Sequence, residues 1–153
     1  VADRDKVEGL ISLIEVDQPE RAMIFRQTKI GVDRLVATLR RRGLPAEAIH
    51  GDMSQKAREH VLLDFREGRL KYLVATDVAA RGLDIPEVSH VFNYDIPEDS
   101  EAYVHRIGRT ARAGRSGRAV TFVGEWDADK LPPIQKIVNN LVQRKLLPIY
   151  ERR

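Results

Sequence analysis

The chain has 153 residues, enough for one domain with a buried core, and its 42% hydrophobic and 32% charged content excludes a disordered protein. It has no cysteine, which excludes disulfides and thiolate metal sites, and its four histidines show no zinc-ligand spacing. No apolar run approaches the roughly 18 residues of a transmembrane helix, so we expect no membrane span.

Hydrophobic spacing predicts helices that alternate with short strands. Val7, Leu10, Ile11 and Ile14 follow the i, i+3, i+4, i+7 pattern of an amphipathic helix, whereas residues 22–25 form a short apolar run typical of a buried strand. Continued along the chain, these patterns predict helix 7–14, strand 22–25, helix 32–39, strand 46–50, a helix from Ser54 to Phe65, strand 72–75, strand 88–93, a helix through 102 and 105, strand 119–123 and helix 134–142.

Alternating strands and helices indicate βαβ units. Such units give an α/β fold with a parallel sheet that helices cover on both faces. We expect a single domain over residues 1–153, with no internal repeat or linker. The chain begins at Val1 rather than methionine, and we therefore expect a fragment of a larger protein or a processed product.

Five arginines stand three residues apart near the C-terminal third, with glycines among them and no acidic residue: Arg106, Arg109, Arg112, Arg115 and Arg118. This segment carries +5 while the whole chain carries +3, so the other residues sum to −2. The alternative is a solvated helix face, but a helix repeats near 3.6 residues and the glycines would weaken it. Because arginine presents a planar fork of donors, the row favours phosphate recognition.

Polar residues follow three of the predicted strands, at the edge where ligands bind open parallel sheets. Hydroxyls, an exposed glycine amide, helix N-termini and an arginine together suit a sugar-phosphate backbone. Each also has a structural alternative, since Thr28 and Ser54 suit helix caps and Asp77 could merely pair with Arg58. Their recurrence at one edge favours nucleic-acid binding by Thr28, Gly51, Arg58 and Thr76.

The sequence has no phosphate-cradling loop of the Gly-x-x-x-x-Gly-Lys-[Ser/Thr] type. No pair of acidic residues after an apolar strand suggests a magnesium site, and Asp77 and Asp84 are candidates only by residue type. Arginines without a nucleotide cradle indicate one half of a bipartite site, in which an arginine finger crosses an interface.

Four ordered segments resemble the C-terminal RecA-like domain of DEAD-box ATP-dependent RNA helicases, over roughly residues 5–145. YVHRIGRTARAG resembles motif VI, ATDVAARGLDIP motif V, MIFRQTK motif IV and HGDMSQKAR the Gln-x-x-Arg region, and NYDIP resembles the Asp-x-Pro element. Ala111 stands where glycine is commoner in motif VI, and because alanine occurs in bacterial-looking members we expect a bacterial source. The resemblance implies a RecA-like three-layer sandwich with a central, mostly parallel sheet.

The resemblance also implies residue roles. Arg109 and Arg112 would be catalytic and reach the γ-phosphate of ATP on an N-terminal domain, with Arg112 as the finger. Gly82 and Asp84 would complete the nucleotide contacts, Asp84 at the ribose. Interdomain coupling would rest on Arg81, His105 and Arg106. RNA would lie on Thr28, Gly51, Gln55, Arg58, Thr76 and Asp77, with Asp77 orienting Arg58. Arg115 and Arg118 receive no role from the resemblance and would be either general basic surface or extra RNA contacts.

The implied protein is a cytoplasmic ATP-dependent RNA helicase that uses Mg²⁺ held mainly by the N-terminal domain. Its RNA and its N-terminal RecA-like domain would be the partners of this chain, which alone would be an inactive monomer. A stand-alone RNA-binding module without catalysis is one alternative. A helicase that acts on DNA is another, because no residue spacing here reads a 2′-hydroxyl.

Overall fold

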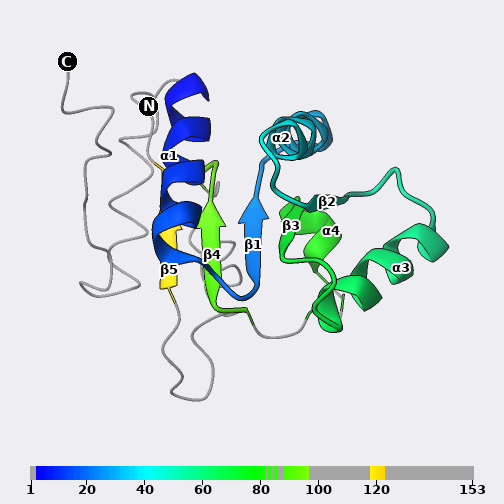
Figure 1. The fold of residues 1–153 in the computed structure, drawn as a ribbon. Helices are drawn as coiled ribbons and strands as arrows, with labels where there is room; N and C mark the ends of the chain where they lie inside the picture. Colours follow the sequence, from blue (N-terminus) through cyan, green and yellow to red (C-terminus); the bar gives the residue numbers. More distant parts are fainter. Residues whose placement is uncertain (1–2, 82, 84, 86–87, 97–117, 123–153) are drawn as a thin grey trace, which may run out of the picture.

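The computed structural model describes residues 3–81, 83, 85, 88–96 and 118–122 (Figure 1). These residues include a five-stranded sheet in which every neighbouring pair is parallel. The strand order is β2-β3-β1-β4-β5, so β1 occupies the centre. The strands are β1 Ala22–Phe25, β2 Ala46–Ile49, β3 Tyr72–Ala75, β4 His90–Asn93 and β5 Arg118–Thr121. The predicted parallel α/β sheet is therefore confirmed.

Four helices accompany the sheet within the described residues: α1 Asp3–Asp17, α2 Lys29–Arg41, α3 Gln55–Arg66 and α4 Asp77–Ala80. The last turns of α2 and α3 run into Gly43 and Gly68, whose φ angles of 83° and 84° lie in the left-handed region that glycine adopts at low cost. Glycine at these two positions explains why each helix stops there and the chain returns toward the next strand.

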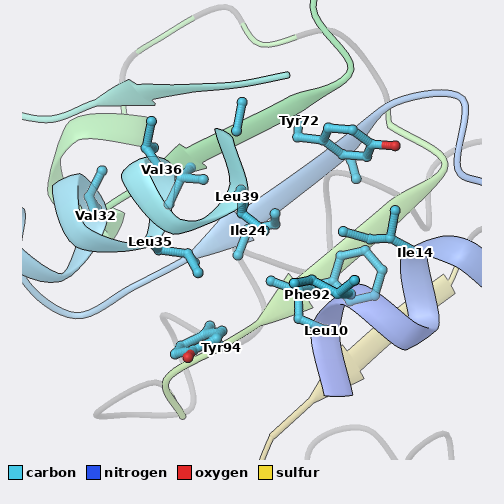
Figure 2. Close-up of a cluster of buried hydrophobic side chains, with 14 of the residues drawn as sticks. Leu10, Ile14, Ile24, Val32, Leu35, Val36, Leu39, Tyr72, Phe92 and Tyr94 are labelled. Carbon is cyan, nitrogen blue, oxygen red and sulfur yellow. The ribbon is translucent and has the colours of Figure 1, made fainter. Parts of the chain in front are cut away.

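The two faces of the sheet are buried against different helices. Alternate residues of β1 point to opposite faces, so that Ile24 packs with the α1 and α2 cluster and Met23 packs with the α3 and α4 cluster. Figure 2 shows the first cluster, in which Leu10 and Ile14 of α1 and the apolar stripe of α2 meet the strands. Helices on both faces give the three layers that the sequence predicted.

Some boundaries differ from the predicted ones. Strand β4 begins at His90 rather than 88, β2 ends at Ile49, and β5 begins one residue early at Arg118. The four-residue helix α4 was not predicted. The helices predicted through 102 and 105 and over 134–142 lie outside the described residues. Within the part that is described, no helix is both long enough and apolar enough to cross a membrane.

Candidate nucleic-acid interface

The carboxyl ends of the strands lie in register, so the loops that follow them emerge at one edge of the sheet. Phe25 of β1 is level with Ala75 of β3 and Asn93 of β4, and Ile49 of β2 is level with Ala75. We call this side the carboxyl edge. Six predicted RNA-binding residues follow these strand ends: Thr28 after β1, then Gly51, Gln55 and Arg58 after β2, and Thr76 and Asp77 after β3.

Arg118 lies at the opposite edge. It opens β5 and pairs in register with His90, the first residue of β4. Parallel strands begin at the amino edge of a sheet, so the backbone of Arg118 is a strand length away from the carboxyl edge. The three-residue arginine rhythm of the sequence therefore ends at the first residue of a strand.

Hydroxyl side chains cap the helices that start at the carboxyl edge. The Thr28 hydroxyl accepts a hydrogen bond from the Gly31 amide at 3.0 Å, and Ser54 accepts one from the Ala57 amide at 3.1 Å. The alternative assignment of both residues as helix caps is confirmed. Thr76 also caps a helix, at 3.3 Å from the Ala79 amide, and is buried, whereas Thr28 is exposed at the start of α2. Thr28 is thus the more accessible of the two threonines.

Arg58 carries an unsatisfied donor. It lies in the first turn of α3 and is half-buried, and its Nε has almost no exposed surface and no hydrogen-bond partner among the described atoms. A buried charged donor without a partner costs about 1–3 kcal/mol or more. The alternative in which Asp77 pairs with Arg58 is not found at this atom. An anionic ligand would supply the missing acceptor.

Gly51 is exposed in the loop between β2 and α3. A Cβ atom built on it would meet nothing within 4 Å, so neither crowding nor a positive φ requires glycine there. The residues on either side of Gly51, His50 and Asp52, contact side chains of α2. His50 Nε2 lies 2.9 Å from Asp33 Oδ1, and Lys29 Nζ lies 2.9 Å from Asp52 Oδ1. The Lys29 hydrogen bond and charge lower the pKa of the Asp52 carboxyl.

A buried ion cluster supports the centre of the carboxyl edge. Asp95, after β4, accepts hydrogen bonds from Arg26 Nε at 2.9 Å and from the Gln27 amide at 2.8 Å. Lys6 of α1 lies 3.7 Å from the same carboxylate, and the Arg26 guanidinium stacks 4.5 Å from the Tyr94 ring centroid. Burial alone would raise the pKa of Asp95, but the Arg26 and Gln27 hydrogen bonds and the charges of Arg26 and Lys6 leave that pKa lowered.

Sequence reasoning gave this cluster no role. Lys6 reads as an ordinary polar position of an amphipathic helix, yet only 5% of its surface is exposed. The available signal was the pair of charged residues within two positions of the ends of two apolar strands, Arg26 and Asp95, which parallel pairing of β1 with β4 brings together.

A cavity of about 300 Å³ opens beside Thr28, between α1 and the start of α2. Two cations, Arg26 and Arg34, contribute to its lining, together with the apolar Val7 and Leu35. Because Arg26 is paired with Asp95, Arg34 is the cation that extends positive charge past Thr28 on the α2 side of the carboxyl edge.

The remaining predicted site residues divide into two groups. Arg81 follows α4, is exposed, and donates its amide to the Asp77 carbonyl at 3.0 Å. The residues assigned to ATP and the other two coupling residues lie outside the described residues: Gly82, Asp84, His105, Arg106, Arg109 and Arg112. Where side chains are described, no group of three His, Cys, Asp or Glu residues could hold a metal ion.

Comparison with known proteins identifies this architecture. A DEAD-box ATP-dependent RNA helicase CshA from Geobacillus kaustophilus is 49% identical over 97% of this chain, and the chain spans only 32% of that relative's length. The E. coli DEAD-box protein SrmB, solved bound to the regulator of ribonuclease activity A, superposes with a TM-score of 0.88 at 38% identity, over 94% of this chain and 85% of that one.

Yeast Dbp5 bound to RNA and ADP BeF3 superposes with a TM-score of 0.85 at 36% identity, over 98% of this chain and 40% of that one. The model of the helicase conserved C-terminal domain matches residues 5–114. The RecA-like fold and the bacterial type of the sequence are thereby confirmed. The chain belongs to the helicase conserved C-terminal domain family, in the form carried by DEAD-box proteins.

Proposed function

We propose that this chain is the C-terminal half of an ATP-dependent DEAD-box RNA helicase. It holds the RNA backbone on its carboxyl edge and supplies arginines to ATP bound on an N-terminal domain. The two domains close only when ATP and RNA are both present, and closure separates a short duplex locally. The proposal includes Mg²⁺ held mainly by the N-terminal domain, a cytoplasmic location and a monomeric isolated domain.

The observation that carries the RNA half of the proposal is the unsatisfied Arg58 Nε at the carboxyl edge. Two other residues of the carboxyl edge add to it, because Gly51 exposes its backbone without any packing reason and Thr28 opens a helix whose N-terminus attracts anions. Such contacts position a sugar-phosphate chain without reading its bases, so we expect little sequence specificity. The Dbp5 relative was solved with RNA bound, which supports the choice of ligand.

The ATP half rests on the family resemblance. Bound ATP supplies the phosphoryl group whose transfer to water drives the cycle. Asp84 and the Gly82 backbone would bind the nucleotide, and Arg109 and Arg112 would stabilise the charge that develops during transfer, a contribution of about 10³–10⁵-fold in rate for an arginine finger. His105, Arg106 and Arg81 would couple the nucleotide to the other domain and to RNA.

Arg58→Ala in the full-length helicase tests the RNA half. Binding of a fluorescent single-stranded RNA is measured at several salt concentrations, because each neutralised phosphate contributes about 0.7 to the slope of log affinity against log salt. We expect Arg58→Ala to lower affinity and to reduce that slope by about one phosphate, to a similar extent on unrelated sequences. Arg41→Ala is the matched control, since Arg41 is an exposed arginine in the last turn of α2, away from the carboxyl edge.

Equal slopes for wild type and Arg58→Ala would remove Arg58 from the RNA contacts and the proposal would lose its main support. The same titration with DNA of matching sequence distinguishes the DNA-helicase alternative. Tighter binding to RNA is expected, and equal affinity for the two would favour that alternative.

A further inference from the structure

We infer that His50, held by Asp33, is a positioning residue that fixes the Gly51 loop against the first turns of α2 and so sets the spacing between Gly51 and Thr28. This inference rests on the proposed function, in which both residues contact the RNA backbone. No role was assigned to His50 or Asp33 by the sequence reasoning. The loop in question is residues 50–54, between β2 and α3.

The sheet alone does not fix this spacing. Thr28 follows the central strand β1, whereas Gly51 follows β2 at the edge of the described sheet, and β3 lies between them. Ladder pairing of β2 ends at Ile49, one residue before the loop begins. Two side-chain contacts then join the loop to α2, the helix that Thr28 caps: His50 to Asp33 and Asp52 to Lys29.

Both nitrogens of the His50 ring are engaged, and their hydrogen bonds assign the tautomer. The Asp52 amide donates to Nδ1 at 3.2 Å, so Nδ1 is the acceptor, and Nε2 carries the hydrogen that it donates to Asp33 Oδ1 at 2.9 Å. The ring therefore runs from α2 to the amide directly after Gly51. Only 7% of His50 is exposed, so water reaches its ring nitrogens poorly, although the Asp33 side chain is itself 63% exposed.

The contact between Asp52 and Lys29 is weaker than that between His50 and Asp33. The side chains of Lys29 and Asp52 are 54% and 69% exposed, and exposed ion pairs contribute little and are screened by salt. Lys29 also directly follows Thr28, where RNA phosphates would compete for its ammonium group. The positioning effect should therefore come mainly from the buried imidazole and Asp33.

Charge-matched variants of Asp33 isolate this hydrogen bond. Asp33→Asn and Asp33→Ala both remove one negative charge near the RNA edge, which by itself strengthens binding to a polyanion. Asparagine keeps an oxygen that can accept from His50 Nε2, whereas alanine does not. The ratio of their RNA affinities therefore reports the hydrogen bond without the charge, and a purely electrostatic role for Asp33 predicts equal affinities.

The experiment uses the full-length helicase and a fluorescent single-stranded oligouridine, together with RNA-dependent ATP hydrolysis. We expect Asp33→Ala to bind RNA about 3- to 10-fold more weakly than Asp33→Asn, the range of one net hydrogen bond. The RNA concentration for half-maximal hydrolysis should rise by the same factor while kcat at saturating RNA stays equal. If Asp33 only stabilised the fold, Asp33→Ala would lower the free energy of unfolding without raising the RNA concentration for half-maximal hydrolysis at unchanged kcat.

Amide hydrogen exchange by NMR gives a readout that does not depend on RNA. The Asp52 amide should exchange faster in Asp33→Ala than in Asp33→Asn, with the Ala57 amide, capped by Ser54, as the internal control. Equal RNA affinities of the two variants, or equal Asp52 exchange, would overturn the inference. Failure of the wild-type helicase to bind RNA would instead refute the proposed function, while the exchange comparison would still decide whether Asp33 holds the loop.

Discussion

Replacing Asp95 by asparagine removes the anion that Arg26 and Lys6 share in the buried cluster joining β1, β4 and α1. The Asp95 carboxylate accepts from Arg26 Nε at 2.9 Å, from Arg26 Nη2 at 3.3 Å and from the Gln27 amide at 2.8 Å. Its side chain is only 14% exposed, and those of Arg26 and Lys6 are 17% and 7% exposed. The variant therefore leaves two cations in a poorly solvated site without their counter-charge.

The structure supports a loss of about 3 kcal/mol in the free energy of unfolding. Breaking a buried ion pair by removing one partner costs about 3–5 kcal/mol, and we take the lower end because asparagine retains one acceptor oxygen and the cluster keeps some contact with water. Asp52→Asn is the matched control, since its exposed pair with Lys29 contributes at most about 1 kcal/mol.

Urea denaturation of the two variants and the wild type, followed by circular dichroism as a function of pH, measures the effect. The folded-state pKa of Asp95 is lowered below its unfolded value of about 3.9. Its stabilisation is therefore fully present above that unfolded value and is lost as the pH falls through the folded one. We expect the gap between wild type and Asp95→Asn to be constant above about pH 5 and to narrow below about pH 4.

A gap smaller than about 1 kcal/mol at pH 7 would refute the reasoning, because it would mean that the cluster is solvated despite its burial. A gap that stayed constant down to pH 3 would show that the loss came from packing and not from the carboxylate charge.

Two further predictions concern the start of α2 and α3. Gly31→Ala should lower the free energy of unfolding by about 1 kcal/mol in the same assay, because its Cβ would lie 3.0 Å from Arg26 Nε and 3.1 Å from Thr28 Oγ1. This crowding outweighs the helix preference for alanine. A gain in stability would show that Arg26 can move aside. Thr28→Val and Ser54→Ala should each lose a helix cap that contributes about 1 kcal/mol to the free energy of unfolding. Only Thr28→Val should weaken binding in the RNA titration described for Arg58→Ala. Equal weakening by both variants would contradict a separate role for Thr28.

The sheet was predictable because its signal is local. The strands at Ala22–Phe25 and Tyr72–Ala75 are continuous apolar runs, and Gly43 and Gly68 mark the ends of α2 and α3. Helix α4 was missed because four residues contain barely one turn and show no periodicity. Thr76 was interpreted as an RNA contact and not as a helix cap, although its hydroxyl caps α4.

The candidate site was predictable in its position but not in its internal contacts. Parallel pairing places the residues after each strand at one edge, which the order of elements already implied. Lys6 contacts Asp95, 89 residues away in the sequence, and His50 contacts Asp33, 17 residues away. No periodic pattern of the sequence reports such contacts.

Arg112→Ala in the full-length helicase tests the central claim, that this chain completes an ATP site on another domain. RNA-stimulated ATP hydrolysis and RNA binding without nucleotide are measured on the same preparation. The account predicts that hydrolysis falls by about 10³–10⁵-fold, the worth of an arginine finger, while RNA affinity stays nearly unchanged. Undiminished hydrolysis, or an RNA affinity that collapses together with hydrolysis, would contradict it and make Arg112 a phosphate anchor for RNA or a residue without a role.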